Sequence, residues 1–225
     1  MSSSVLPFGL LTLGQSPRID VSPTFDAILG DEAAYGQAGA LDGKSPDEIR
    51  SLGPGPGETG IETRLADGTA VMLSRRKLLP LLAGQGKRLA LGCRHVVLLC
   101  SGAFPELRRP DIPLVEPVVL VRGIIKTLAR GKTLGVVGPA SDMAEAPEQW
   151  RAYARNVVTA AASPYGGDIR MVTQAAMAAE SQGAHVLLLD DMGFTMEHAA
   201  AARSGVGIPV ICATTATAGL MKEMV

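Results

Sequence analysis

Short uninterrupted apolar runs, each followed by small or polar residues, recur along the chain. The clearest are residues 96–99, with the sequence VVLL, and residues 186–189, with the sequence VLLL. Runs of this length and composition are typical of strands buried on both faces of a parallel sheet. Similar runs predict further strands at 7–13, 133–137 and 208–213.

Segments with helical spacing lie between these runs. After Glu116-Pro117, apolar residues recur at Val118, Val121, Ile125 and Leu128, which is the spacing of one helix face. Serine or threonine at an N-cap and glycine after the last turn mark the ends of other helices. The helices predicted in this way cover 21–29, 74–91, 117–128, 174–182 and 195–202, with a short one opening at 45–48 and another at the C-terminus.

Three weaker patterns complete the prediction of elements. Residues 66–69, with the sequence ADGT, predict a hairpin turn between strands at 62–65 and 70–73. Weaker strands are expected at 34–36 and at 169–173. A further helix is expected around Trp150 and Tyr153.

The alternation of strands and helices predicts an α/β fold with two similar parallel-sheet halves. The first domain is expected to hold residues 1–115 and 210–225, since the last strand resembles a return to the first half. The second domain is expected to hold residues 116–209. In such sheets ligands bind beyond the carboxyl ends of the strands. We therefore expect a cleft between the two halves.

Composition narrows the function classes. Hydrophobic residues make up 47% of the chain and aromatic residues 4%, so the core must be built from Ala, Val, Leu and Ile. The net charge of −1 and the pI near 6.3 disfavour a nucleic-acid partner. The apolar runs are too short to cross a bilayer, and the first residues lack the pattern of a signal peptide. The three cysteines show no metal-binding spacing, so a reduced cytoplasmic protein without a metal is expected.

Cys100 is the first candidate for chemistry. It directly follows the 96–99 run and precedes two small residues, Ser101 and Gly102. Backbone N–H groups at such a strand end can stabilise a thiolate and hold a substrate oxyanion. The alternative is a buried structural cysteine, because cysteine is among the residues most often found in cores. Cys93 and Cys212 lack this setting and are expected to be inert.

Asp190 and Asp191 follow the 186–189 run, an unusual place for two acids. A carboxylate at a strand end suits acid–base chemistry, although a loop or capping acid is equally compatible with the sequence. Successive side chains point to opposite faces, so only one of the two can readily face a ligand. The residues alone leave open which of the two it is, and Gly193, which follows them, is a candidate binding residue.

Two turns before helices are candidate carboxylate-binding sites. One contains Gln15, Ser16 and Arg18, and the other contains Gly138, Pro139 and Ala140. Backbone N–H groups at a helix start bind anions, and an arginine can clamp an acid with two hydrogen bonds. Neither turn has the glycine pattern of a nucleotide-binding loop. Arg75, after the predicted hairpin, is a further candidate cation, although such charges are most often solvated.

Four segments together resemble the AroM family over essentially the whole chain. They are TLGQSPR at 12–18, SRRK at 74–77, LLCSGAFP at 98–105 and LDDMGF at 189–194. The family is similar to a distant branch of the aspartate/glutamate racemase superfamily. The resemblance implies two pseudosymmetric parallel α/β domains with a site between them.

The resemblance also carries an expectation about chemistry. In those racemases each half brings a cysteine to a strand end; one thiolate removes the α-proton and the other thiol donates from the opposite face. Cys100 matches the first cysteine, whereas Asp191 stands at the second position. This departure argues against ordinary two-thiol racemization. Relatives with one working cysteine decarboxylate or isomerize acids.

The leading interpretation is an enzyme acting on a small carboxylate or dicarboxylate without a cofactor. Isomerase, racemase-like and decarboxylase chemistry are all compatible with one cysteine. Cys100 would be the nucleophile or proton donor, and Asp191 a second acid–base or binding group. The alternative is a non-catalytic accessory or regulatory protein that binds a small acid. A redox role fits less well, because no resolving cysteine is apparent, and homo-oligomerisation is left open.

Overall fold

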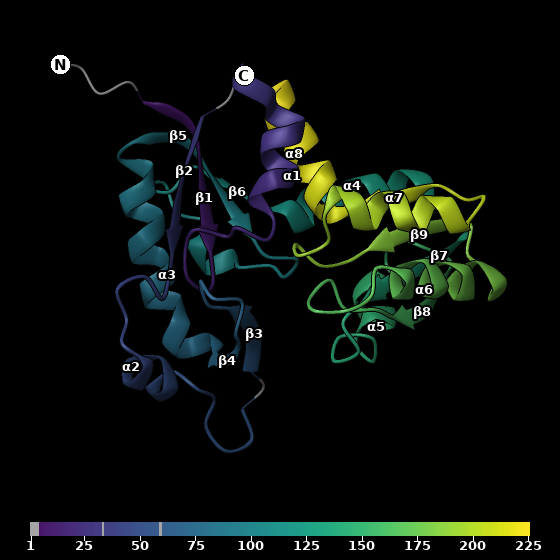
Figure 1. The fold of residues 1–225 in the computed structure, drawn as a ribbon, viewed down its shortest axis with the longest axis horizontal. Coiled ribbons are helices and arrows are strands. Elements are labelled where there is room, and N and C mark those ends of the chain that lie inside the picture. The colour runs from purple at the N-terminus through teal and green to yellow at the C-terminus, as the bar shows by residue number, and fades with distance from the viewer. Residues whose placement is uncertain (1–4, 33, 59) are drawn as a thin grey trace. The chain divides into compact units, whose positions relative to one another are not determined.

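The structure is a computed structural model that describes residues 5–32, 34–58 and 60–225. The chain divides into two compact units, one up to Glu116 together with Val225 and one from Pro117 to Met224 (Figure 1). Each unit has its own parallel sheet. The predicted α/β class with two parallel-sheet units is therefore confirmed. Within the described residues, no helix has the length and apolar character needed to span a membrane.

The first unit is built around a parallel sheet of strand order β2-β1-β5-β6. β3 and β4 form a separate antiparallel hairpin, and the turn between them contains the predicted turn residues 66–69. The elements are β1 (Leu6–Thr12), α1 (Ser22–Leu29), η1 (Gly30–Glu32), β2 (Tyr35–Gly39), α2 (Pro46–Ser51), β3 (Gly60–Arg64), β4 (Ala70–Ser74), α3 (Arg75–Ala90), β5 (Cys93–Leu99), η2 (Pro105–Leu107) and β6 (Leu114–Val115).

The strand register brings three chain turns to one edge of the first sheet. Thr12, the last residue of β1, lies opposite both Gly39 at the end of β2 and Leu99 at the end of β5. All three strands run in the same direction. The segments that follow them, including Cys100, therefore leave the sheet at its carboxyl edge, where ligands bind in folds of this class.

Helix α3 covers this sheet through one apolar stripe. Leu78, Leu82, Gly86 and Leu89 are buried at spacings of four, four and three residues, the period of a helix face. The Ser74 side chain accepts a hydrogen bond from the Lys77 N–H and caps the helix start. The helix packs against β1, β2 and β5, so it fixes the position of the strand that ends at Cys100.

The second unit repeats the plan with a sheet of order β10-β9-β7-β8, all parallel. Leu189 at the end of β9 lies opposite Val137 of β7 and Cys212 of β10. The elements are α4 (Pro117–Leu128), β7 (Thr133–Gly138), α5 (Ala146–Trp150), β8 (Asn156–Ala161), α6 (Arg170–Ser181), β9 (Val186–Leu189), α7 (Met196–Gly205), β10 (Val210–Cys212) and α8 (Ala213–Glu223).

The expected return of residues 210–225 to the first domain is wrong. β10 pairs with β9 in the second sheet, and the helix after it, α8, packs against α4 of the second unit. The segment β9-α7-β10 is a continuous strand–helix–strand unit. Consecutive strands of this kind usually become neighbours in one sheet, because the crossover is short. The last strand therefore extends the sheet that its predecessor already belongs to.

Two element predictions in this unit are also wrong. The strand predicted at 169–173 is instead the start of α6, which continues through the helix predicted at 174–182, because Val172, Ala175 and Ala179 make a buried stripe at helical spacing. The fourth strand is β8 instead, an edge strand whose residues are only half-buried or exposed. Helix α5 ends at Trp150, and Tyr153 lies in the turn that follows.

The small residues of this core allow helix and sheet to approach closely. A Cβ added at Gly135 of β7 would lie 2.9 Å from Leu187 Cδ1 and 3.0 Å from the Cβ atoms of Ala179 and Ala184. Such contacts are too short for carbon atoms in a packed interior. Glycine is therefore required at position 135, where β7 packs against β9 and α6. The buried face of α6 is rich in alanine for the same reason, since larger side chains would not fit this close approach.

The same substitution at two glycines is expected to have opposite effects. Gly135→Ala should lower the free energy of unfolding by about 1–3 kcal/mol, because the added methyl overpacks the core. Gly123→Ala, on the exposed face of α4 where an added Cβ meets nothing within 4 Å, should raise it by up to about 1 kcal/mol through helix propensity. Urea denaturation measures both values. A stable Gly135→Ala protein would contradict the packing account.

Candidate functional site

Cys100 lies directly after β5 at the carboxyl edge of the first sheet. Its Sγ accepts a hydrogen bond from the backbone N–H of Gly102 at 3.3 Å, and its own N–H donates to the carbonyl of Leu98. The side chain is half-buried. A backbone donor aimed at sulfur stabilises negative charge there. The predicted setting of this cysteine, at a strand end and beside small residues, is what the structure contains.

The other two cysteines differ in their surroundings. Cys93 and Cys212 are buried within the hydrophobic cores of the first and second units. Burial raises the pKa of both thiols, because the thiolate loses its solvation. Both are therefore poorer nucleophiles near neutral pH than a cysteine at ordinary exposure.

Arg75 braces the loop that follows Cys100. Its Nη2 donates to the carbonyl of Ala103 at 3.0 Å and to Glu106 Oε2 at 2.9 Å. Its guanidinium carbon lies 4.1 Å from the centre of the buried Phe104 ring, a cation–π contact. The sequence placed Arg75 among candidate ligand-binding cations. The structure brings it to the Cys100 loop, where it contacts three loop residues from the first turn of α3.

Glu116 holds the same loop from another element. This carboxylate is largely buried; its Oε1 accepts the Phe104 N–H at 3.2 Å and its Oε2 accepts Arg108 Nε at 2.5 Å. A buried carboxylate is tolerated when charged and neutral donors satisfy it. The loop after Cys100 is therefore fixed by a cation on α3 and an anion after β6. No local sequence pattern pairs residues so far apart, and Glu116 was missed as a site-supporting residue.

The turn after β1 is already bound to a carboxylate of its own unit. Asp42 accepts the Ser16 N–H and the Ser16 hydroxyl, both at 2.7 Å, and the Gly39 N–H at 2.8 Å. The Gln15 N–H donates to the carbonyl of Arg64 in the β3–β4 hairpin. Of the predicted anion-binding groups of this turn, the Ser16 N–H and hydroxyl thus bind the carboxylate of Asp42, whereas the Gln15 N–H binds a backbone carbonyl.

Arg18 is likewise engaged. Its Nε and Nη2 donate to the two oxygens of Asp20 at 2.8 and 2.6 Å, the two-pronged geometry expected for an acid ligand. Its backbone N–H donates to Gln37 Oε1. Arg18 is a buried residue, so this pair stabilises the turn between β1 and α1. A ligand carboxylate would have to displace Asp20 to use the guanidinium in the same way.

In the second unit the predicted turn follows β7. Gly138 is buried; its carbonyl accepts the Ala162 N–H, and a Cβ added there would lie 2.8 Å from Met143 Cε. Pro139 has no N–H, and its carbonyl accepts from Asp142. Ala140 is exposed. The turn lies at the carboxyl edge of the second sheet, with Ala140 as its accessible member.

Asp191 is held at one oxygen by two donors. Its Oδ1 accepts the Tyr165 hydroxyl at 2.9 Å and the Gly193 N–H at 2.6 Å. The Tyr165 ring covers Gly193 so closely that an added Cβ would lie 2.4 Å from it. The N–H of Gly193, predicted to bind a ligand, therefore serves Asp191. Tyr165 was missed, because a contact spanning 26 residues leaves no local sequence signal.

Asp190 faces a different environment. Its Oδ2 accepts the buried Trp150 indole N–H at 2.8 Å, and its own N–H donates to the carbonyl of Val137. Enclosure by protein atoms raises the pKa of this carboxyl from 3.8 to about 7, with a smaller contribution from the nearby charges of Asp191 and Asp142. The Trp150 hydrogen bond and the Arg122 charge act in the opposite direction.

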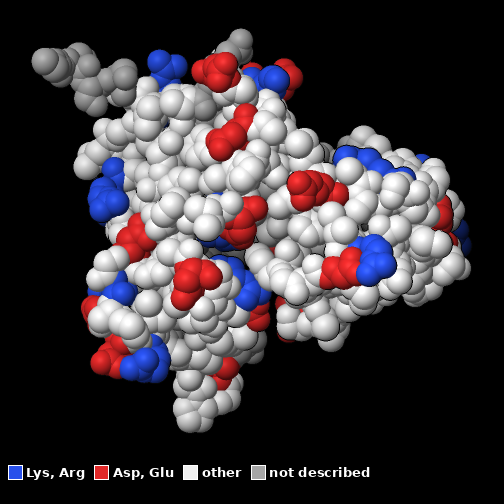
Figure 2. All heavy atoms as spheres, viewed as in Figure 1, with Lys and Arg blue, Asp and Glu red and all other residues white. Residues whose placement is uncertain are grey.

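Other candidate groups have structural roles. His198 closes a capping box at the start of α7, where its Nδ1 lies 3.0 Å from the Thr195 nitrogen. Burial lowers its pKa. Among the described residues there is no group of three His, Cys, Asp or Glu side chains arranged to hold a metal ion. On the face drawn in Figure 2, acidic and basic side chains are interspersed, so neither charge dominates this face.

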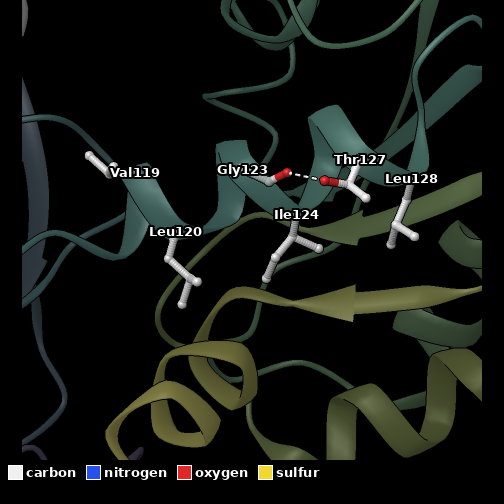
Figure 3. Close-up of a pocket in the computed structure, with 6 residues that line it drawn as sticks. All are labelled: Val119, Leu120, Gly123, Ile124, Thr127 and Leu128. Atoms are coloured by element: carbon white, nitrogen blue, oxygen red, sulfur yellow. Dashed lines mark hydrogen bonds between the residues drawn. The ribbon is translucent and has the colours of Figure 1, made fainter. Parts of the chain in front are cut away.

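An apolar depression of about 440 Å³ lies along α4 (Figure 3). Its lining contains no titratable side chain, and its one hydroxyl, that of Thr127, donates to the carbonyl of Gly123. It therefore offers no group for acid–base chemistry. The lining residues are Val119, Leu120, Gly123, Ile124, Thr127 and Leu128.

Comparison with solved structures identifies the fold class. Arylmalonate decarboxylase aligns with a TM-score of 0.61 at 15% identity, covering 97% of this chain and 92% of the other. Glutamate racemase from Francisella tularensis subsp. tularensis SCHU S4, solved with D-glutamate, aligns at 0.58 and 10% identity, covering 100% and 81%. Picrophilus torridus aspartate racemase aligns at 0.55 and 14% identity, covering 96% and 93%. The fold is that of the aspartate/glutamate racemases and related decarboxylases.

Comparison with protein families assigns the chain to one of them. The family described as AroM protein matches residues 8–225. The chain therefore belongs to the AroM family, as the motifs around Gln15, Arg75, Cys100 and Asp191 led us to expect. A search of curated proteins gave no match.

The raised pKa of Asp190 predicts an unusual dependence of stability on pH. Between about pH 4 and pH 7 the folded carboxyl keeps its proton, whereas the unfolded carboxyl has lost it, so stability falls as pH rises. Asp190→Asn should remove this decline. Relative to wild type, its free energy of unfolding at pH 7.5 compared with pH 4.5 should improve by an amount on the order of 1 kcal/mol or more.

Urea denaturation across this pH range measures the effect. Asp168→Asn provides the matched control, because the pKa of the exposed Asp168 is lowered by Arg170. Its stabilising effect is lost only as pH falls through the acid range. An unchanged pH slope in Asp190→Asn would show that this carboxyl is ionised in the folded protein.

Proposed function

We propose that this AroM-family chain is an enzyme that acts on a small carboxylate or dicarboxylate, with Cys100 as its reacting thiol. The observation that carries the proposal is the Gly102 N–H aimed at Cys100 Sγ at the carboxyl end of β5. This is the sheet edge at which α/β proteins bind ligands. Isomerase, racemase-like and decarboxylase reactions are the classes considered.

The similar structures support this choice of substrate class. Their names refer to arylmalonate, glutamate and aspartate, all of which carry carboxylates. A racemase inverts a stereocentre and a decarboxylase releases carbon dioxide, and both outcomes require a proton to be placed on a carbon atom. A shared fold is compatible with many reactions, so the role of Cys100 is proposed from the contacts of this chain's own residues.

The proposed role of Cys100 is proton transfer at the carbon next to a carboxylate. As a thiolate it would take the proton, so that a C–H bond breaks and an S–H bond forms. As a thiol it would give a proton to the carbanion that is left after carbon dioxide departs. Both directions need only acid–base groups, so we propose a reaction without a cofactor.

The braced loop would supply substrate-binding groups. Ser101 and Gly102 follow the thiol, and their backbone N–H groups are candidates for holding a developing oxyanion. Within the described part of the chain, Arg75 hydrogen-bonds this loop through Nη2 only. We therefore propose that its other nitrogens bind a substrate carboxylate. We propose Arg75 as the residue that binds the substrate carboxylate, in preference to Gln15, Ser16 and Arg18. The turn that holds those three residues already binds the carboxylates of Asp42 and Asp20.

In the second unit Asp191 was predicted as the partner acid, with Gly138, Pro139, Ala140 and Gly193 as binding residues. Ala140 is the exposed member of its turn, whereas the Gly193 N–H serves Asp191. The proposed contribution of this unit is therefore the carboxyl pair 190–191 and the N–H of Ala140.

The alternative proposal is a protein that binds a small acid without converting it. The engagement of Asp191 by Tyr165 and Gly193 favours this alternative, because a carboxylate held by two donors is typical of a structural role as well. Binding of an acid without turnover would distinguish the two proposals.

Cys100→Ser is expected to reduce turnover at least about 100-fold, because a hydroxyl is a far poorer proton carrier than a thiol near neutral pH. Phenylmalonate and the two enantiomers of glutamate and aspartate form the substrate panel. Proton NMR in D₂O detects deuterium uptake, inversion or loss of carbon dioxide.

Cys93→Ala is the matched control, since that thiol is buried and remote from the strand end. It should keep the wild-type rate. Turnover by Cys100→Ser at the wild-type rate would contradict the role of the thiol. Saturable binding of a panel acid by the wild type without any turnover would favour the acid-binding alternative.

A further inference from the structure

The two adjacent carboxyls after β9 are held in different ways. We infer that Asp190, and not Asp191, is the acid–base residue of the second unit. The inference rests on the proposed function, because a proton-exchanging residue requires a reaction to serve. It departs from the sequence-based expectation, which gave that role to Asp191.

Asp191 is already held by hydrogen bonds within its own unit. The same oxygen receives the Tyr165 hydroxyl and the Gly193 N–H. The carbonyl of Asp191 also accepts the Phe194 N–H, so side chain and backbone together close the turn between β9 and α7. Protonation of Asp191 would weaken two hydrogen bonds to its side chain, whereas protonation of Asp190 weakens only the one from Trp150. Asp191 is therefore better suited to fix the turn than to exchange a proton.

Asp190 is positioned through its backbone as well as its side chain. Its N–H donates to the carbonyl of Val137 at 2.8 Å, which extends the β7–β9 pairing by one residue beyond the strand. The carboxyl is thereby fixed at the sheet edge. Its Oδ2 receives the indole N–H of Trp150, a buried side chain with little freedom to move. One oxygen is oriented by this donor, and Oδ1 is the oxygen that can carry a proton.

The charges around Asp190 favour the protonated form. Asp191 is the next residue, Asp142 lies in the segment after β7, and Arg122 projects from α4. The two acids oppose a further negative charge. Among the described residues, Arg122 forms no ion pair, and its Nε is buried without a hydrogen-bond partner. Its guanidinium lies 5.7 Å from the Tyr153 ring. Burial is the main cause of the raised pKa of about 7; Asp191 and Asp142 add to it, and the Trp150 hydrogen bond and Arg122 oppose it.

The step assigned to Asp190 is a proton transfer. The carbanion forms when the Cys100 thiolate takes the proton next to the substrate carboxylate, so that a C–H bond breaks and an S–H bond forms. The neutral Asp190 carboxyl then gives its proton to this carbanion. The O–H bond breaks, a C–H bond forms, and Asp190 is left as a carboxylate. Before the next cycle the Cys100 thiol releases its proton to water and Asp190 takes one up, so that the protons balance. A residue that is half-protonated near neutral pH can both give and receive a proton without a large barrier.

The experiment combines a carboxyl titration with a rate profile. Carbon-13 NMR of aspartate-labelled protein follows the carboxyl resonances from pH 4 to pH 9 in the wild type, Asp190→Asn, Asp191→Asn and Trp150→Phe. In parallel, kcat is measured over the same range with phenylmalonate, glutamate and aspartate. Asp168→Asn is the control, because this exposed acid of the same unit pairs with Arg170 and not with Trp150 or Tyr165.

We expect one resonance with a midpoint near pH 7, lost in Asp190→Asn and kept in Asp191→Asn. Trp150→Phe should raise its midpoint, because the carboxylate loses a donor, and Asp191→Asn should lower it, because a neighbouring charge is lost. The fall of kcat with rising pH should move in the same direction in each variant. Asp190→Asn should reduce kcat at least tenfold and remove this limb, and Asp168→Asn should change neither readout.

Three results would overturn the inference. The first is a midpoint of Asp190 near pH 4 in an active protein. The second is a midpoint that moves in Trp150→Phe while the kcat profile stays fixed. The third is a greater loss of kcat in Asp191→Asn than in Asp190→Asn. A wild-type protein without turnover on any panel acid is a different result, which contradicts the proposed function and, with it, the catalytic role of Asp190.

Discussion

Parallel pairing of the strands is the constraint on which both units depend. In the first unit the ends of β2, β1 and β5 lie opposite one another, and in the second unit the ends of β7, β9 and β10 do so. A parallel register obliges every following segment to leave the sheet at the same edge. Ser16, Asp42 and Cys100 are far apart in sequence, and the parallel register brings the segments that contain them to the same edge.

The two edges carry different chemistry. The first presents a thiol whose loop is fixed from two sides, by Arg75 on α3 and by Glu116 after β6. The second presents two carboxyls, one engaged by Tyr165 and Gly193 and one enclosed beside Trp150. Each edge thus pairs a rigid support with a group that can gain or lose a proton. Rigid support matters because proton transfer depends steeply on distance.

The sequence predicted the buried strands and the capped helices well, because their signals are local. β5 and β9 are continuous apolar runs, and Ser74 and Thr195 cap their helices as expected. β8 was missed because it is an edge strand with half-buried residues. The sheet to which β10 belongs was also misjudged, since strand order depends on pairing and not on the strand's own residues.

The candidate site could be predicted only in part for the same reason. Cys100 and the acids after β9 are visible in sequence, because each follows an apolar run. The partners of the two acids are not, since Trp150 contacts Asp190 across 40 residues and Tyr165 contacts Asp191 across 26. The same holds for Asp42, which contacts Ser16 across 26 residues. The sequence therefore names reactive groups, whereas the contacts that decide which group is engaged come from the tertiary structure.

The central claim is that Cys100 is the reactive thiol of the chain. The rate of iodoacetamide modification at each cysteine, followed by peptide mass spectrometry near neutral pH, tests it most directly. Cys100 should be modified first, because Cys93 and Cys212 are buried and their thiol pKa values are raised. A small carboxylate that binds the protein should slow modification at Cys100 alone. Equal rates at all three thiols, unchanged by any acid, would contradict the account.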